Sequence, residues 1–118
     1  MDRDVAAELH ELHARVCKAI ADPKRLLIIN ELRDRELSVG DLCESLGLSQ
    51  SNASQHLAVL RERGVVTARR EGTSVIYALR GTKVLAAVDL LREFLAEELS
   101  GRARLGDSLA TAEERPLG

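Results

Sequence analysis

Histidine and cysteine are the side chains of this 118-residue chain best suited to metal binding or redox chemistry. Four of them are considered together: His10, His13, Cys17 and Cys43. The first three are spaced at i, i+3 and i+7, so on a helix they share one strip of surface, and Cys43 could join them in the fold or across a dimer. Nitrogen and sulfur ligands of this kind suit zinc or copper(I).

The two cysteines have two other interpretations, a thiol redox switch and a pair of buried structural thiols. Of the three interpretations, we favour the pair of buried structural thiols. We therefore expect no cofactor and no resident metal.

A second set of side chains has the properties of a surface that contacts nucleic acid. Residues 50–63 are predicted to form a helix capped by Ser49, with Ala53 and Leu57 turned inward. The opposite face begins with short, polar and uncharged side chains, which can donate to and accept from base edges, and the free N–H groups at the helix start favour a phosphate. The expected contacts are Gln50, Ser51, Asn52, Ser54, Gln55 and His56, with Ser51, Ser54 and Gln55 as the groove readers.

The polar face of the helix over residues 50–63 also has other interpretations. The polar face could be an ordinary solvated one, although surface helices usually favour Lys and Glu. His56 lies about 60° from the buried centre of the helix. A structural hydrogen bond at the helix edge is therefore favoured over a phosphate contact for His56.

A pair of arginines, Arg69 and Arg70, follows beside a predicted hairpin turn. Residues 65–67 and 74–77 are β-formers that flank a turn over residues 70–73. Arginine suits phosphates and narrow minor grooves, although loop arginines are often merely solvated. Two helices joined by a tight link and followed by a basic hairpin tip predict a winged helix that binds duplex DNA.

The other elements follow from periodicity and caps. Apolar residues at helical spacing predict a helix over residues 4–21, and Asp22-Pro23 starts the next helix, over residues 23–34. The apolar side of the second helix is expected to carry Leu26, Leu27, Ile29 and Leu32. Ser38 with Asp41 resembles a capping box, which opens a short helix that stops at Gly47.

A long last helix is expected over residues 82–100. The predicted fold is mainly α with a small β-hairpin, in the order α-α-α-α-β-β-α, as one domain over residues 1–100 that binds DNA through residues 38–80. The tail over residues 101–118 has weak periodicity, which is typical of partial disorder.

The charge of the chain argues against DNA binding until it is divided along the sequence. The formal net charge is -2, but residues 1–48 carry 7 basic and 10 acidic side chains, residues 49–80 carry 5 and 2, and residues 81–118 carry 5 and 7. A net positive charge is therefore confined to residues 49–80, the predicted DNA-binding helix and hairpin.

Composition excludes several other classes of protein. Tyr77 and Phe94 are the only aromatic residues, so binding of single strands by base stacking has no platform. No apolar run is long enough to span a membrane, and the charged N-terminus does not resemble a targeting signal. We expect a cytoplasmic protein, and two irregularly spaced cysteines fit a reducing compartment.

Four motifs resemble those of the ArsR/SmtB repressors of bacteria and archaea. Residues 21–26, ADPKRL, are similar to the family's opening of the second helix, and residues 36–42, ELSVGDL, to its E-L-x-V-x-D-L stretch. Residues 48–57, LSQSNASQHL, resemble its recognition helix, and Gly72 with Tyr77 fits its wing. The motifs occur in the family's order and in one register.

The resemblance implies a homodimeric repressor that leaves its operator when a small effector binds. The first and last helices would form the interface, and the apolar stripes within residues 5–20 and 84–99 support this independently. Dimer symmetry would place the recognition helices about 34–36 Å apart, one turn of DNA, and predicts an imperfect palindromic operator.

The family's effector motifs are not retained. Where its soft-metal sensors carry thiolates, this chain has Ser38 and Gly40, and residues 82–100 lack the histidine of its other metal site. Its sensors of reactive sulfur pair a second-helix cysteine, here Asn30, with one in the last helix, which has none. The effector therefore stays open.

Two other classes of function also stay open. A protein-interaction module with the same fold would bind no specific duplex. A cysteine hydrolase would need Cys17 or Cys43 beside a histidine base. The resemblance instead implies structural positions, because the family has a bulky core residue at Cys17 and commonly alanine at Cys43. An enzyme is therefore disfavoured, and no catalytic residue is expected.

Overall fold

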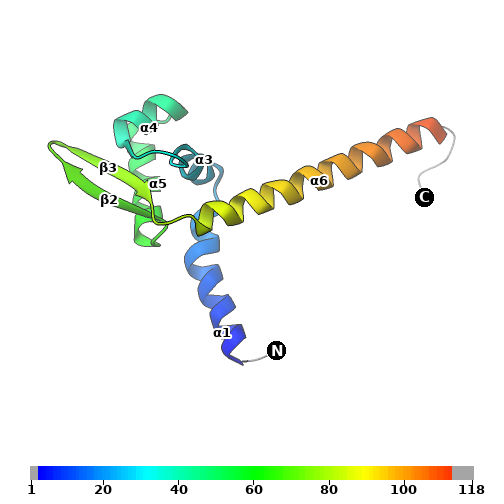
Figure 1. Ribbon diagram of the computed structural model, residues 1–118, viewed down its shortest axis with the longest axis horizontal. Coiled ribbons are helices and arrows are strands. Elements are labelled where there is room, and N and C mark those ends of the chain that lie inside the picture. Colours follow the sequence, from blue (N-terminus) through cyan, green and yellow to red (C-terminus); the bar gives the residue numbers. More distant parts are fainter. Residues whose placement is uncertain (1–2, 113–118) are drawn as a thin grey trace. The chain divides into compact units, whose positions relative to one another are not determined.

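The computed structural model describes residues 3–112, apart from the side chains of residue 103 and residues 105–112. The chain divides after Thr82 into two compact units. The first holds the helices and the sheet up to residue 82, and the second holds one long helix (Figure 1). None of the described helices combines the length and the apolar character that a bilayer crossing requires.

The N-terminal helix changes its hydrogen-bonding pattern along its length. It runs from α1 (Arg3–Leu12) through the π-helical turn η1 (His13–Cys17) into α2 (Lys18–Ile20). The Lys18 N–H donates to the His13 carbonyl, five residues back. The helix predicted over residues 4–21 is confirmed in extent, but the π-helical turn was not predicted.

Three helices follow, each begun by a side-chain cap. The Asp22 carboxylate accepts from the Lys24 and Arg25 N–H groups and starts α3 (Pro23–Glu31). A reciprocal Ser38–Asp41 capping box starts α4 (Val39–Leu46), and Ser49 caps α5 (Gln50–Glu62).

The link between α4 and α5 is the three residues 47–49. Gly47 ends α4 with φ +67°, a left-handed conformation that glycine adopts without a side-chain clash. The predicted helix-turn-helix is therefore confirmed.

The sheet has three antiparallel strands in the order β1-β3-β2. The hairpin is β2 (Val66–Glu71) and β3 (Ser74–Leu79), and β1 (Leu37–Ser38) pairs with β3. Glu71 pairs with Ser74, so the turn is residues 72–73, and the predicted turn over residues 70–73 is two residues too long because Arg70 and Glu71 belong to β2. β1 was not predicted, because two residues leave no alternation to detect.

The core of the first unit is aliphatic. It is centred on side chains that are almost fully buried: Ile28, Ile29, Leu42, Leu57, Leu60 and Val66. The predicted apolar side of α3 is wrong in part, because Ile28 is buried whereas Leu27 is 50% exposed. Residues 26–29 are all apolar, so their pattern does not define the rotation of the helix.

The second unit is α6 (Lys83–Ala112). The predicted end near residue 100 is wrong, because α6 continues through Ala112, where alanine, leucine and arginine favour helix despite two glycines. Residues 113–118 of the predicted tail lie outside the described residues. A series of apolar side chains on α6 is 53–65% exposed: Leu90, Leu91, Phe94, Leu95 and Leu99.

Candidate nucleic-acid interface

The helix α5 presents a polar face and buries an apolar one. Ala53, Leu57 and Leu60 are fully buried, which fixes the rotation of the helix. The predicted groove readers all lie on the exposed side, together with the first helical residue: Gln50, Ser51, Ser54 and Gln55. Asn52 and His56 are half-buried at its margins.

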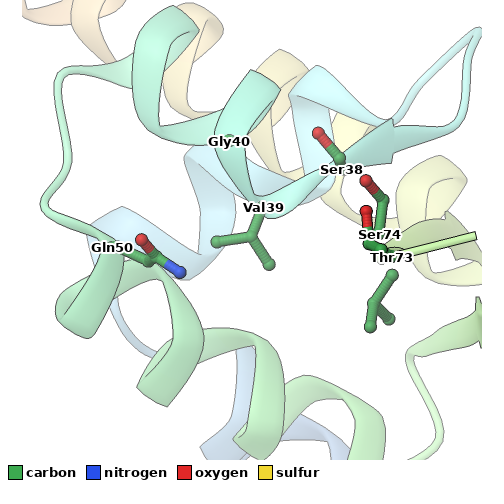
Figure 2. A pocket seen from close by; sticks show the side chains of 7 residues that line it. Ser38, Val39, Gly40, Gln50, Thr73 and Ser74 are labelled. Carbon is green, nitrogen blue, oxygen red and sulfur yellow. The ribbon is translucent and has the colours of Figure 1, made fainter.

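A polar cleft of about 310 Å³ lies beside the start of this helix. It is lined by the first residues of α4, by Gln50 and by the hairpin turn: Ser38, Val39, Gly40, Gln50, Thr73, Ser74 and Val75. Figure 2 shows Gln50 facing Val39 on one side, with the Ser38 and Ser74 hydroxyls on the other.

The N-terminal residues of both α4 and α5 line the cleft. Free N–H groups and the positive end of the helix dipole at such N-termini suit an anion. The hydroxyls of Ser38, Thr73 and Ser74 were not predicted as site residues. The predicted N-cap role of Ser38 was the signal for its position, whereas the two hairpin residues carried none.

The two wing arginines have different environments. The Arg69 guanidinium bonds Glu36 at 2.6 Å and Glu71 at 2.9 Å. The hydrogen bond to Glu36 and, to a smaller extent, the hydrogen bond to Glu71 raise the pKa of Arg69 above its ordinary value. The Arg70 side chain is exposed and has no hydrogen bond or ion pair among the described residues. The charge of Arg69 is therefore balanced locally, whereas that of Arg70 is available to a phosphate.

The half-buried His56 makes a contact of the structural kind. Its Nδ1 lies 3.2 Å from a guanidinium nitrogen of Arg25. A guanidinium can only donate, so Nδ1 accepts and a neutral ring carries its proton on Nε2. This contact favours the structural hydrogen bond over the phosphate contact for His56.

The residues considered for effector sensing do not form a compact site. His10 and His13 line an open groove of about 350 Å³ on α1, with Ala6 and Leu9. Among residues 3–102 and residue 104, no group of three or more histidine, cysteine or acidic side chains could hold a metal ion.

The prediction that both cysteines are buried is wrong for Cys17. Its side chain is exposed at the end of η1, and Cys43 on α4 is half-buried, both as free thiols. No residue of α1 or η1 is buried, and Cys17 shares this exposure.

The helix-turn-helix, the hairpin wing and the exposed polar face of α5 define a winged helix-turn-helix DNA-binding domain. Comparison with known proteins agrees. The model of the arsR family of bacterial regulatory proteins matches residues 22–68. The uncharacterized HTH-type transcriptional regulator Rv0081 of Mycobacterium tuberculosis is 40% identical over 102 residues, covering 86% of this chain and 90% of the relative.

Solved structures give the same result. The crystal structure of Rv0081 matches with a TM-score of 0.73 and 41% identity over 80% of this chain and 96% of that one. Reduced HlyU from Vibrio cholerae matches with a TM-score of 0.70 and 41% identity over 79% and 97%. The homodimeric winged helix-turn-helix DNA-binding domain of Mb0332 from Mycobacterium bovis matches with a TM-score of 0.73 and 34% identity over 86% and 93%.

The chain therefore belongs to the ArsR family of bacterial regulatory proteins. It is a DNA-binding transcriptional regulator, and its relatives are regulators of transcription, which are not enzymes.

Proposed function

We propose that this regulator is a cytoplasmic homodimeric repressor that binds an imperfect palindromic operator and leaves it when an effector binds. The observation that carries the DNA-binding proposal is the exposed polar face of α5, which is uncharged over its first half and begins at the polar cleft beside the wing.

The first half of α5 reads the major groove in this proposal. Ser51, Ser54 and Gln55 are exposed and donate to or accept from base edges, and the small Ala58 on the same face lets the helix approach closely. Gln50 and Asn52 flank these readers at the start of the helix.

Phosphates are bound on either side of this helix. The cleft at Gln50 takes one phosphate through helix N–H groups and hydroxyls. Arg70 contacts a second phosphate from the wing. Arg69 holds the wing in place through Glu36, and His56 positions α5 through Arg25.

A second copy of the chain completes the binding unit. Val5, Leu9 and Leu12 on α1 are 42–46% exposed, and α6 carries its own exposed apolar series. Both surfaces suit burial against another copy, and the homodimeric state of the Mb0332 domain supports this. A two-fold axis makes the two half-sites of the operator inverted repeats.

The effector is proposed to act through the N-terminal helix or α4 rather than on the DNA-binding face. The residues to test remain His10, His13, Cys17 and Cys43. Exposure of Cys17 favours a thiol switch over a zinc or copper(I) site. Unchanged operator affinity on adding oxidant, zinc, copper(I) or arsenite would exclude all of these effectors.

Fluorescence anisotropy with a palindromic duplex, selected from a random pool by the wild-type protein, tests the DNA contacts. Replacing Gln55 with Ala should cut the preference for that duplex over random DNA by about tenfold, because a good base contact contributes about 1–3 kcal/mol of discrimination. Replacing Arg70 with Ala should weaken both duplexes alike and reduce the salt slope by about one.

Glu62→Ala is the matched control, because it truncates an exposed side chain on the same face at the far end of α5. It should leave the preference for the palindrome unchanged. If Gln55→Ala and Glu62→Ala behave alike, the assignment of the reading face is wrong. A wild-type protein that selects no duplex would instead favour the protein-interaction module.

A further inference from the structure

Two arginines join the recognition helix α5 to main-chain carbonyls of the N-terminal helix. We infer that Arg25 and Arg63 are positioning residues that hold α5 at a fixed place relative to the N-terminal helix. Through this joint they set the half-site spacing that the dimer accepts. This inference rests on the proposed function, because it concerns how a dimeric operator-binding protein measures its operator.

Arg25 connects three elements. From α3 its Nε donates to the Ala19 carbonyl, one terminal nitrogen donates to the Lys18 carbonyl at 3.2 Å, and the other lies 3.2 Å from Nδ1 of His56 on α5. The two carbonyls belong to the end of the N-terminal helix, where main-chain oxygens lack helical partners. One rigid guanidinium therefore fixes α5 against α2.

Arg63 makes the second connection, at the other end of α5. It is the C-cap residue of that helix, and its guanidinium donates to the Ala14 carbonyl at 3.2 Å. Ala14 lies in the π-helical turn η1. Arg63, the C-cap of α5, therefore holds Ala14, and Arg25, which contacts α5 at His56, holds Ala19.

Two points of attachment restrain rotation as well as distance. A single contact would leave α5 free to pivot about it, whereas contacts at His56 and Arg63 span the second half of the helix. The contact between Arg25 and His56 requires a hydrogen-bond acceptor at position 56. The ammonium of a lysine in place of Arg25 would not reach all three acceptors.

The joint has a consequence for DNA because α1 carries the apolar residues Val5, Leu9 and Leu12 proposed to contact the partner. If this surface is fixed to the dimer axis, any shift of α5 relative to the N-terminal helix changes the separation of the two recognition helices. One base pair corresponds to about 3.4 Å along DNA. A loosened joint therefore tolerates operators whose spacer is one base pair too long or too short.

The test compares three duplexes by fluorescence anisotropy with the full chain: the selected palindrome, a single half-site, and the palindrome with its spacer changed by one base pair. Arg25→Gln and Arg63→Gln should each weaken palindrome binding about tenfold, a typical coupling between sites. Half-site binding should change much less, and the wild-type penalty for the altered spacer should shrink.

Two matched comparisons separate the joint from charge and from folding. Arg61→Gln removes the same charge from an exposed site on α5 and should weaken half-site and palindrome together. His56→Asn keeps an acceptor at the Nδ1 position and should retain the spacer penalty, whereas His56→Ala should lose it. Arg63 is exposed, so Arg63→Gln decides the outcome if Arg25→Gln fails to fold.

An unchanged spacer penalty in a folded, dimeric Arg63→Gln protein overturns the inference, as does equal behaviour of His56→Asn and His56→Ala. A wild-type protein that binds the half-site and the palindrome equally well overturns the proposed dimeric function instead. The two failures are therefore distinguishable.

Discussion

The Asp22 carboxylate organises the junction between the first two helices. It accepts from the Lys24 N–H at 2.8 Å and the Arg25 N–H at 3.2 Å, and so fixes the first turn of the helix that carries Arg25. Desolvation raises the pKa of Asp22, but the Arg25 and Lys24 N–H groups outweigh it, together with His56 in its protonated form and the Arg25 charge, and the pKa lies below its ordinary 3.8.

This shift predicts a contribution to stability that depends on pH. Because the pKa is lower in the folded state, the cap stabilises the protein fully above the ordinary value of 3.8 and is lost as the pH falls through the folded value. Asparagine caps equally well but does not titrate. Urea unfolding of Asp22→Asn should therefore show a shallower loss of stability on acidification than wild type.

Asp34→Asn is the control for this experiment, because Asp34 is exposed and caps no helix among those described. Its pH profile should follow the wild type. Parallel profiles for wild type and Asp22→Asn would show that the charged cap contributes nothing.

Helical periodicity predicted the exposure of Ser51, Ser54 and Gln55, because it determines which side of a helix faces the core. Residue types did not separate Arg69 from Arg70. The two alternate on β2, and the carboxylate that engages Arg69 comes from Glu36, 33 residues away. Likewise the acceptor role of His56 depends on Arg25, which no pattern within α5 reveals.

At the level of elements, the wing is held by charge pairs as well as by its strands. Glu36 lies next to β1, so its bond to Arg69 on β2 connects the two outer strands of the sheet. The guanidinium of Arg69 also bonds Glu71 on its own strand. Arg69 thus contributes to the placement of Arg70 rather than to the net charge of the wing.

This arrangement predicts unequal salt effects for the two arginines. Replacing Arg70 with Gln should reduce the slope of log affinity against log salt by about one, because one phosphate contact is lost. Replacing Arg69 with Gln should change the slope much less, because two carboxylates already balance its charge. Equal slopes for the two variants, measured by anisotropy on one duplex, would show that Arg69 leaves its carboxylates to bind DNA.

The order of the elements could be predicted because caps and apolar spacing are local signals. Ser38, Ser49 and the Asp22-Pro23 pair each began a helix as expected. The two-residue strand β1, the rotation of α3 and the last turns of α6 could not be predicted. Strand β1 is defined by its pairing with β3, and the rotation of α3 is defined by packing against the core. In the last turns of α6, continued helix propensity outweighs weak periodicity.

For the whole molecule, the exposed apolar series on α6 predicts a stable association of two copies. Replacing Leu91 with Glu places a charge among Leu90, Phe94 and Leu95. Sedimentation should then show monomers, and palindrome affinity should fall at least about a hundredfold because the linked second half-site is lost. Half-site affinity should stay near the wild-type value.

Glu93→Gln, an exposed change on the same helix, should leave the dimer intact. A dimer that survives Leu91→Glu would show that other residues hold the two copies together. The apolar stripe was evident from the sequence, and the family resemblance implied that a second copy of the chain covers it.

The π-helical turn η1 changes the angular position of side chains about the axis of the N-terminal helix. Because a π-helical turn holds an extra residue, everything N-terminal to His13 is rotated relative to Ala19 and Ile20, compared with an uninterrupted α-helix. Deleting one residue within this turn would restore plain α-helix and swing the Val5, Leu9 and Leu12 stripe by about 100° around the helix axis. The extra residue thus determines the direction in which the apolar stripe of α1 faces. Inserting or deleting one residue there would rotate this proposed partner surface without changing any residue of the DNA-binding face.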